Sequence, residues 1–195
     1  MRRSLALLVA GLALAGCAPD LRKDHPFDGD ISTGPLVEAS DLGGGVTRLD
    51  IDATNKTAKV YVDLDELREL KPAEAFDTNA WELSARRFEI FVNGGSSNPS
   101  GVVRVAVLKD QDFDGLTKAP ADGYVQDGAA PVFNDVEGGW YYYDLGVHRL
   151  ITREDLMYVV QTSDGAYKKL KMLSYYDSAG TPGVLSLKVA AVDAP

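Results

Sequence analysis

Short apolar segments, each bounded by turn-forming residues, recur along this chain and constrain its fold more than any other feature. Residues 46–51 alternate in character, and residues 101–108 are a nearly continuous apolar run. Alternation is typical of a strand with one buried face, and a short continuous run is typical of a fully buried strand. Asn93-Gly94-Gly95 and Asp164-Gly165 supply tight turns. We therefore expect an all-β fold, a single domain of many short antiparallel strands.

Further apolar segments complete the expected set of strands. They are residues 57–63, 81–92 (as one long strand or two short ones), 140–145, 157–162, 167–176 and 184–192. Asn55-Lys56 suits a hairpin turn that would join the first two strands. Leucines spaced three apart from Leu64 to Leu70 predict one or two helical turns before Pro72. Residues 110–128 are polar and rich in Gly and Pro, which predicts a loop.

The N-terminal residues have the pattern of a lipoprotein signal peptide. Arg2 and Arg3 precede an apolar run over residues 5–15, which is shorter than the about 20 residues that a membrane-spanning helix needs. Leu14-Ala15-Gly16-Cys17 then matches the lipobox, in which small residues allow cleavage and the cysteine thiol accepts the lipid. Cys17 is the only cysteine in the sequence, so lipidation accounts for it and no disulfide can form within one chain.

These features predict three parts of the chain. Residues 1–16 would be a signal peptide, residues 17–45 a lipidated flexible tether, and residues 46–195 the β domain. The lipid would anchor the secreted protein to the bacterial outer membrane, on its periplasmic or its cell-surface face. The formal net charge of −9 argues against a nucleic-acid partner.

Motifs that carry enzymatic chemistry are absent from the sequence. It contains no G-x-S-x-G, P-loop, G-x-G-x-x-G or H-E-x-x-H pattern. Its two histidines are His25 and His148, and His25 lies in the predicted tether. We therefore expect a binding protein rather than an enzyme.

Three blocks of the sequence resemble one known family. The first runs from Trp81-Glu82-Leu83 to Asn93-Gly94-Gly95-Ser96-Ser97, the second is residues 119–124, and the third extends from Trp140-Tyr141 to Gly183-Val184. In order and spacing they resemble the HmuY-like haem-binding lipoproteins. The resemblance implies an all-β fold with haem held between loops at one end, and capture of haem for iron acquisition. It also implies delivery of the haem to a TonB-dependent outer-membrane receptor, and no enzymatic activity.

The resemblance further implies where the iron ligands would lie. Members of the family hold haem iron with histidine or methionine pairs from loops. One position falls in residues 125–139, which contain no His, Met or Cys, and the other falls near Leu145, three residues before His148. His148 is therefore the expected axial ligand, and the candidates for the haem pocket are Tyr141, Tyr143, Arg149 and Met157. Each has a structural alternative: a surface histidine, core tyrosines, a solvated arginine and a core methionine.

An acidic segment predicts a different metal site. Asp110, Asp112 and Asp114 alternate and Gly115 follows, as in the first half of a calcium-binding loop. Position twelve, where such a loop has a bidentate glutamate, is Ala121. The segment could equally be an acidic loop, since Asp and Gly dominate turns. The motif keeps open an alternative function: a non-haem surface lipoprotein of the same fold, stabilised by calcium, that binds a protein or a glycan.

Overall fold

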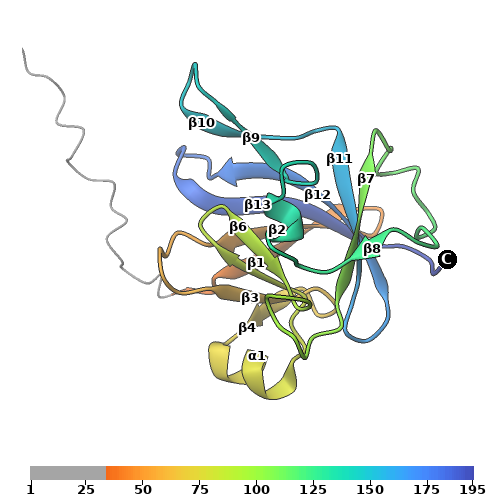
Figure 1. The fold of residues 1–195 in the computed structure, drawn as a ribbon. Helices are drawn as coiled ribbons and strands as arrows, with labels where there is room; N and C mark the ends of the chain where they lie inside the picture. Colours follow the sequence, from red (N-terminus) through yellow and green to blue (C-terminus); the bar gives the residue numbers. More distant parts are fainter. Residues whose placement is uncertain (1–33) are drawn as a thin grey trace, which may run out of the picture.

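Thirteen strands, one α-helix and one 3-10 helix make up residues 34–195, the part of the chain that the computed structural model describes (Figure 1). Their bounds are β1 Val37–Gly43, β2 Val46–Asp52, β3 Val60–Asp63, β4 Arg68–Leu70, α1 Pro72–Thr78, β5 Leu83–Arg86, β6 Glu89–Val92, β7 Arg104–Lys109, β8 Tyr124–Val125, η1 Val132–Asn134, β9 Tyr141–Asp144, β10 Arg149–Thr152, β11 Leu156–Gln161, β12 Tyr167–Tyr176 and β13 Pro182–Ala191. The predicted all-β fold is therefore confirmed. Within these residues no helix is long and apolar enough to span a membrane.

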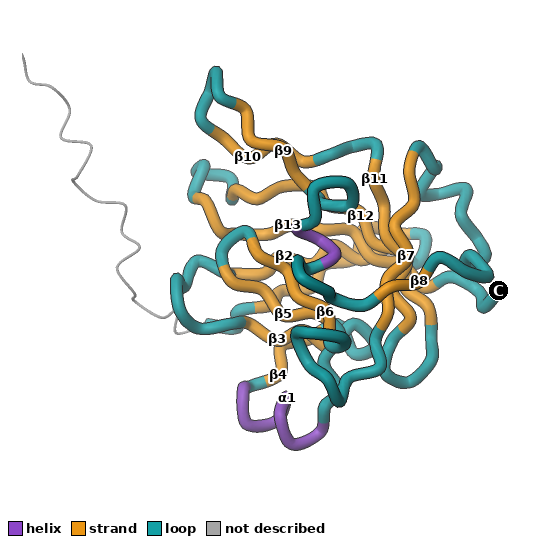
Figure 2. The backbone as a smooth tube through the Cα atoms, in the orientation of Figure 1, coloured by secondary structure: helices purple, strands orange, loops and turns teal. Residues whose placement is uncertain are grey.

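The strands form two sheets and a separate hairpin (Figure 2). The larger sheet has seven strands in the order β1-β2-β13-β12-β11-β7-β8, and the smaller has four in the order β4-β3-β5-β6. β9 and β10 pair only with each other. All pairings between these strands are antiparallel. Most neighbours are consecutive in sequence, but β13 returns to pair with β2 and so joins the N-terminal strands β1 and β2 to the C-terminal strands of the sheet.

The main core draws apolar side chains from both sheets, among them Leu49, Ile51, Val62, Leu83, Ile90, Val105, Tyr158, Val160, Leu170 and Leu187. Side chains alternate between the two faces of a strand. On β11, Tyr158 and Val160 therefore enter this core, while Met157 and Val159 lie in two smaller clusters with Phe113 and Ala119. The loop that follows β7 thus covers the outer face of the seven-stranded sheet.

The β domain begins earlier than the sequence predicted. Strand β1 falls inside the range 17–45 that was assigned to the tether, and it pairs with β2 from Val37↔Ile51 to Gly43↔Val46. Val37 is buried in the main core, whereas the other residues of β1 are exposed. The boundary at residue 46 is therefore wrong. The strand was missed because an exposed edge strand has no apolar alternation to detect. The signal peptide, Cys17 and His25 lie outside the described residues.

Two local predictions need revision, and one alternative is decided. Asn55-Lys56 does not join a hairpin, because β2 and β3 belong to different sheets. The leucine-spaced segment 64–70 is a turn followed by β4, and the helix instead starts at Pro72, whose fixed φ suits a first helical turn. Of the two alternatives predicted for residues 81–92, the structure has the two short strands, which are joined at Arg87, a residue with a left-handed backbone and φ 55°.

Candidate functional site

The β9–β10 hairpin stands away from both sheets and carries the expected iron ligand (Figure 1). In its register Tyr143 lies opposite Leu150, and residues 145–148 form the loop. The carboxylate of Asp144 accepts hydrogen bonds from the backbone N–H of Gly146 at 2.7 Å and of Val147 at 3.3 Å. A two-stranded hairpin is marginally stable alone, so contacts at its base must hold it in place.

Aromatic packing provides those contacts at the base. Trp140 is fully buried, and its indole N–H donates to the carbonyl of Phe88 at 3.0 Å. Tyr141 packs edge-on against the Phe88 ring at 5.8 Å. On the other strand, the N–H of Leu150 donates to the hydroxyl of Tyr176 at 3.0 Å, which ties β10 to β12. These contacts attach both strands of the hairpin to the rest of the domain, while loop residues 145–148 are exposed.

His148 and Tyr143 form a hydrogen-bonded pair near the tip of this hairpin. The Tyr143 hydroxyl lies 3.0 Å from Nδ1 of His148, and the Tyr143 side chain is 50% exposed. His148 has a left-handed backbone with φ 53°. Three further large apolar side chains of the hairpin are exposed: Tyr142, Leu145 and Val147. Exposed apolar side chains that gather in one place indicate a binding surface.

One arginine, Arg149, begins β10, and another, Arg153, follows that strand. The guanidinium of Arg149 lies 3.9 Å from the ring centroid of Tyr176, which is cation–π geometry. Arg153 donates to the carbonyl of Glu137 at 2.7 Å and to the carboxylate of Asp155 at 3.0 Å. Hydrogen bonding from Arg153 lowers the pKa of Asp155. Arg149 is thus an exposed cation beside His148, whereas Arg153 is engaged in structural contacts.

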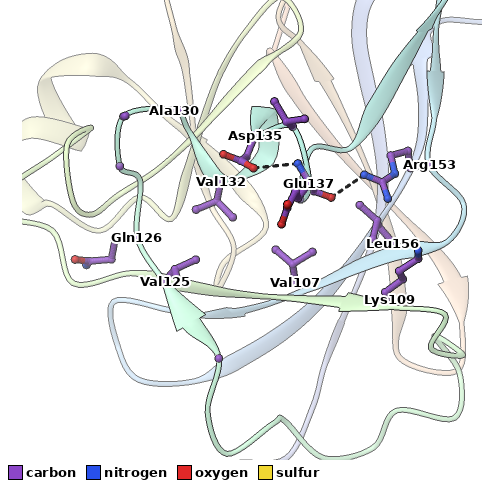
Figure 3. A pocket seen from close by; sticks show the side chains of 15 residues that line it. Val107, Lys109, Val125, Gln126, Ala130, Val132, Asp135, Glu137, Arg153 and Leu156 are labelled. Carbon is purple, nitrogen blue, oxygen red and sulfur yellow. Dashed lines mark hydrogen bonds between the residues drawn. The ribbon is translucent and has the colours of Figure 1, made fainter.

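An open pocket of about 1000 Å³ lies between β7–β8 and the segment that runs from Gln126 to Gly138 (Figure 3). Apolar side chains project into it, and Lys109 and Arg153 lie at one end (Figure 3). Its wall is the segment in which the resemblance implied a ligand for iron. None of its lining residues is a His, Met, Cys or Tyr, so this wall offers no side chain that commonly binds haem iron.

Buried hydrogen bonds hold the pocket wall in place. The carboxylate of Asp127 accepts from the N–H of Val92 at 2.8 Å, the hydroxyl of Ser97 at 2.6 Å and the N–H of Val132 at 2.9 Å. The hydroxyl of Tyr158 donates to the carbonyl of Gly138 at 2.8 Å, and burial raises the pKa of Tyr158. Sequence reasoning missed Asp127, because Asp127-Gly128 has the composition of an ordinary turn.

The predicted pocket residues do not all gather at the hairpin. Tyr143, His148 and Arg149 lie on it together, and Tyr141 lies on the same strand but packs toward the core. Met157 is 1% exposed and packs with Phe113 under the loop after β7. That environment gives Met157 a packing role.

The calcium prediction is not supported. Within residues 34–195, no group of three or more His, Cys, Asp or Glu side chains could hold a metal ion. The carboxylate of Asp112 accepts from the N–H of Gly115 at 2.8 Å, which is a local turn contact. The ammonium group of Lys169 donates to the carbonyls of Phe113 at 2.6 Å and Leu116 at 2.8 Å.

Leu116 occupies position seven of the motif, whose carbonyl would bind calcium in a calcium loop. A lysine ammonium group already binds that carbonyl. Asp110 and Asp114 therefore belong, with Asp112, to an acidic loop whose backbone is held by a buried lysine.

Comparison with known proteins identifies the fold. No family model matches the chain, and no curated protein matches it. Among solved structures, a candidate HmuY-like haem-binding protein from Bacteroides vulgatus is 15% identical with a TM-score of 0.57, and the match covers 80% of this chain and 97% of that one. A candidate lipoprotein from Bacteroides fragilis is 17% identical with a TM-score of 0.56, covering 83% and 97%.

The apo HmuY analogue of Tannerella forsythia is 17% identical with a TM-score of 0.54, covering 82% of this chain and 97% of that chain. These matches span nearly the whole of each solved chain at low sequence identity, so they establish a shared architecture. The chain has the HmuY-like fold.

Proposed function

We propose that this protein is an exported lipoprotein that binds haem at the β9–β10 hairpin and serves haem and iron acquisition. The observation that carries the proposal is the His148–Tyr143 pair, exposed at a projecting hairpin among apolar side chains. The proteins from Bacteroides vulgatus and Tannerella forsythia, described as haem-binding and as an HmuY analogue, support it through their shared fold.

The chemistry of the hairpin suits a porphyrin. Haem is flat and largely apolar, with an iron atom at its centre and two anionic propionates at one edge. Histidine and tyrosine both bind haem iron in proteins. Leu145 and Val147 would cover part of the ring, and Arg149 would offer a cation to a propionate. Because residues 125–139 contain no His, Met or Cys, we expect one protein ligand to the iron.

Titration with haemin tests the proposal. The exported protein with Cys17→Ser, which cannot be lipidated, should give a saturable one-to-one shift of the Soret band. The double variant Tyr143→Phe, His148→Ala should bind haemin at least about tenfold more weakly. Tyr142→Phe is the matched control, because its side chain leaves the opposite face of β9. Unsaturable absorbance changes in the parent protein would refute haem binding.

Anchoring is a separate part of the proposal. We infer that Cys17 carries lipid and holds the domain at the outer membrane, where haem would pass to a TonB-dependent receptor. The residue after Cys17 is alanine rather than an acidic residue, which favours the outer membrane. Cells that express the native chain should incorporate labelled palmitate and retain the protein in the membrane fraction. Cys17→Ser should abolish both results, and retention of the variant would contradict a lipid anchor.

The open pocket favours a second candidate function, the binding of a non-haem ligand such as a protein segment or a glycan. Its mixed lining of apolar and charged side chains, and its lack of iron-binding side chains, support this alternative. Val125→Glu would place a charge at the pocket without changing the hairpin, because Val125 lines the pocket and its side chain is 51% exposed. If the parent protein fails to bind haemin but binds a glycan or peptide that this variant does not bind, the second function replaces the first.

A further inference from the structure

We propose that a groove between β10 and β12 binds an extended peptide segment of a partner protein, which adds to β12 as a strand and places an acidic side chain beside Arg149. The groove has a volume of about 430 Å³ and shares no lining residue with the open pocket. This inference goes beyond the proposed function, since it requires no haem. It rests on two free strand edges, an apolar lining and one cation without an acidic partner.

Strand β12 has a free edge over its second half. β11 pairs with β12 only up to Leu170, so residues 171–176 have no strand partner on that side within the described chain. Their other side pairs with β13 as far as Tyr176. The hydroxyl of Ser174 bonds to the carbonyl and the N–H of Tyr176 at 2.7 and 2.9 Å, which closes the last residue of this edge. An unpaired sheet edge is a template for another strand.

The edge of β10 that faces β12 is also unpaired. β10 pairs only with β9, and a turn at residues 154–155 separates it from β11 (Figure 1). The N–H of Arg153 donates to the carbonyl of Trp140, on the β9 side of the hairpin. By alternation, the backbone groups of Leu150 and Thr152 point away from β9. The N–H of Leu150 accordingly meets a side chain of β12, so the two free edges face each other across the groove.

The lining of the groove fits a peptide with apolar and acidic side chains. It combines apolar and hydroxyl-bearing residues with one cation and no carboxylate: Val147, Arg149, Leu150, Ile151, Thr152, Leu173, Ser174, Tyr175 and Tyr176. Val147 is 59% exposed and Leu173 is 41% exposed, so a ligand would bury apolar surface on both walls. In a chain with a formal net charge of −9, a groove that carries a cation and no anion favours acidic ligands.

Arg149 is available to an acidic ligand because it has no acidic partner of its own. None of the ion pairs among residues 34–195 includes Arg149. Asp144 lies opposite it in the hairpin, but the carboxylate of Asp144 accepts from N–H groups of the loop. The Tyr176 ring packs against the guanidinium at 3.9 Å and holds it at the wall of the groove. Its N–H donors can therefore bind a carboxylate in the two-bond geometry of arginine.

The two edges distinguish a peptide from a small carboxylate. A small carboxylate would use Arg149 alone, whereas a strand would also bond to the backbone of residues 171–175 and of Thr152. In strand addition, backbone hydrogen bonds supply affinity and alternate side chains supply specificity. The groove provides both, so an extended peptide is the ligand that uses all of its features.

Binding of synthetic peptides tests the proposal. The probe is the end-blocked peptide Thr-Val-Asp-Val-Thr-Val, labelled with fluorescein and titrated with the exported Cys17→Ser protein. It should bind saturably, and the same peptide with Lys in place of Asp should bind at least about tenfold more weakly. A third peptide, N-methylated at every second residue, should lose as much, because both of its sides would face a strand. Amide hydrogen exchange at residues 171–175 should slow when the Asp peptide binds.

Variants locate the site. Arg149→Glu should bind the Asp peptide at least about tenfold more weakly and the Lys peptide more tightly than the parent protein does. Leu173→Asp should weaken binding of the Asp peptide to a similar extent, and it changes no residue of the haem proposal. Arg104→Glu is the matched control and should bind like the parent, because Arg104 also lies near a tyrosine ring but on β7, outside the groove. Circular dichroism checks that each variant is folded.

The outcomes separate this proposal from haem binding. Absence of saturable binding of the Asp peptide, or equal binding by Arg149→Glu, would overturn the peptide site whether or not haemin binds. Equal binding of the N-methylated peptide would indicate a carboxylate site without strand addition, which also overturns it. Exchange at residues 171–175 that speeds up on dilution of the protein alone would assign the groove to a second copy instead. Loss of peptide binding in Leu173→Asp with an unchanged haemin titration would support the site independently of haem.

Discussion

Glu82 is a buried carboxylic acid that links parts of the fold far apart in sequence, and its replacement by glutamine tests how burial controls stability. The side chain has 0% exposure. One oxygen accepts from the N–H of Leu64 at 2.7 Å, and the other accepts from Ser163, through its N–H at 3.2 Å and its hydroxyl at 2.6 Å. Burial is the largest cause that raises the pKa of Glu82, from 4.5 to about 7.

Because the pKa of Glu82 is raised in the folded chain, the free energy of unfolding depends on pH. Between pH 4.5 and about 7 the folded chain holds this proton more tightly than the unfolded chain. The free energy of unfolding therefore falls as pH rises through that window, and the contribution is fully present only below the unfolded pKa. At about 1.4 kcal/mol for each unit of pKa, acidification from about pH 8 to about pH 5 should add about 2–3 kcal/mol to the free energy of unfolding.

Glu82→Gln removes the titration and keeps the size of the side chain. Its amide has one acceptor oxygen, so the N–H of either Leu64 or Ser163 loses its partner, at a cost of about 1–3 kcal/mol. Urea unfolding at a series of pH values should show that the parent protein gains about 2–3 kcal/mol more than the variant on acidification. Glu154→Gln, at an exposed position, is the matched control. Parallel pH profiles for parent and Glu82→Gln would refute a buried carboxyl group that titrates near neutrality.

Three further substitutions test the contacts around the pocket, the acidic loop and the hairpin. Asp127→Asn should lower the free energy of unfolding by about 2 kcal/mol, because an amide oxygen cannot replace both carboxylate oxygens toward two buried N–H groups; urea unfolding measures this. Lys169→Met should speed proteolysis within residues 110–117, since the carbonyls of Phe113 and Leu116 lose their donor. Calcium should leave the Tm of the parent protein unchanged. Trp140→Phe should cost about 2–4 kcal/mol through lost volume and a lost hydrogen bond to Phe88, measured by thermal unfolding. Unchanged stability or cleavage in any of these would contradict the contact concerned.

Some elements of this fold could be predicted from the sequence, because the pattern that indicates them lies within a few residues. Strands such as β12 and β13 show apolar periodicity, and Asp164-Gly165 carries a turn in which Gly165 has φ 85°. Strand β1 escaped prediction because most of its side chains face solvent. Helix α1 was missed because Pro72 was interpreted as a stop rather than a start.

The candidate site, like the fold, could be predicted from the sequence only in part. His148 could be nominated from sequence because the family resemblance implies an iron ligand near it, and Tyr143 because it is an aromatic residue on the preceding strand. Their 3.0 Å contact could not, since it depends on the strand register and on the left-handed backbone of His148. Met157 looked suitable by residue type, yet the two-residue period of β11 turns it away from the main core.

The sequence by itself determined the elements and the chemistry available to them: short strands, turns, a lipobox around Cys17 and a shortage of iron-binding side chains in residues 125–139. Only the tertiary structure decided which strands meet, as when β13 pairs with β2, and which charges meet a partner, as when Lys169 binds the carbonyls of the acidic loop. The physical reason is that periodicity and turn propensity act within a few residues. Sheet pairing and the satisfaction of buried polar groups depend instead on residues brought together across the whole chain.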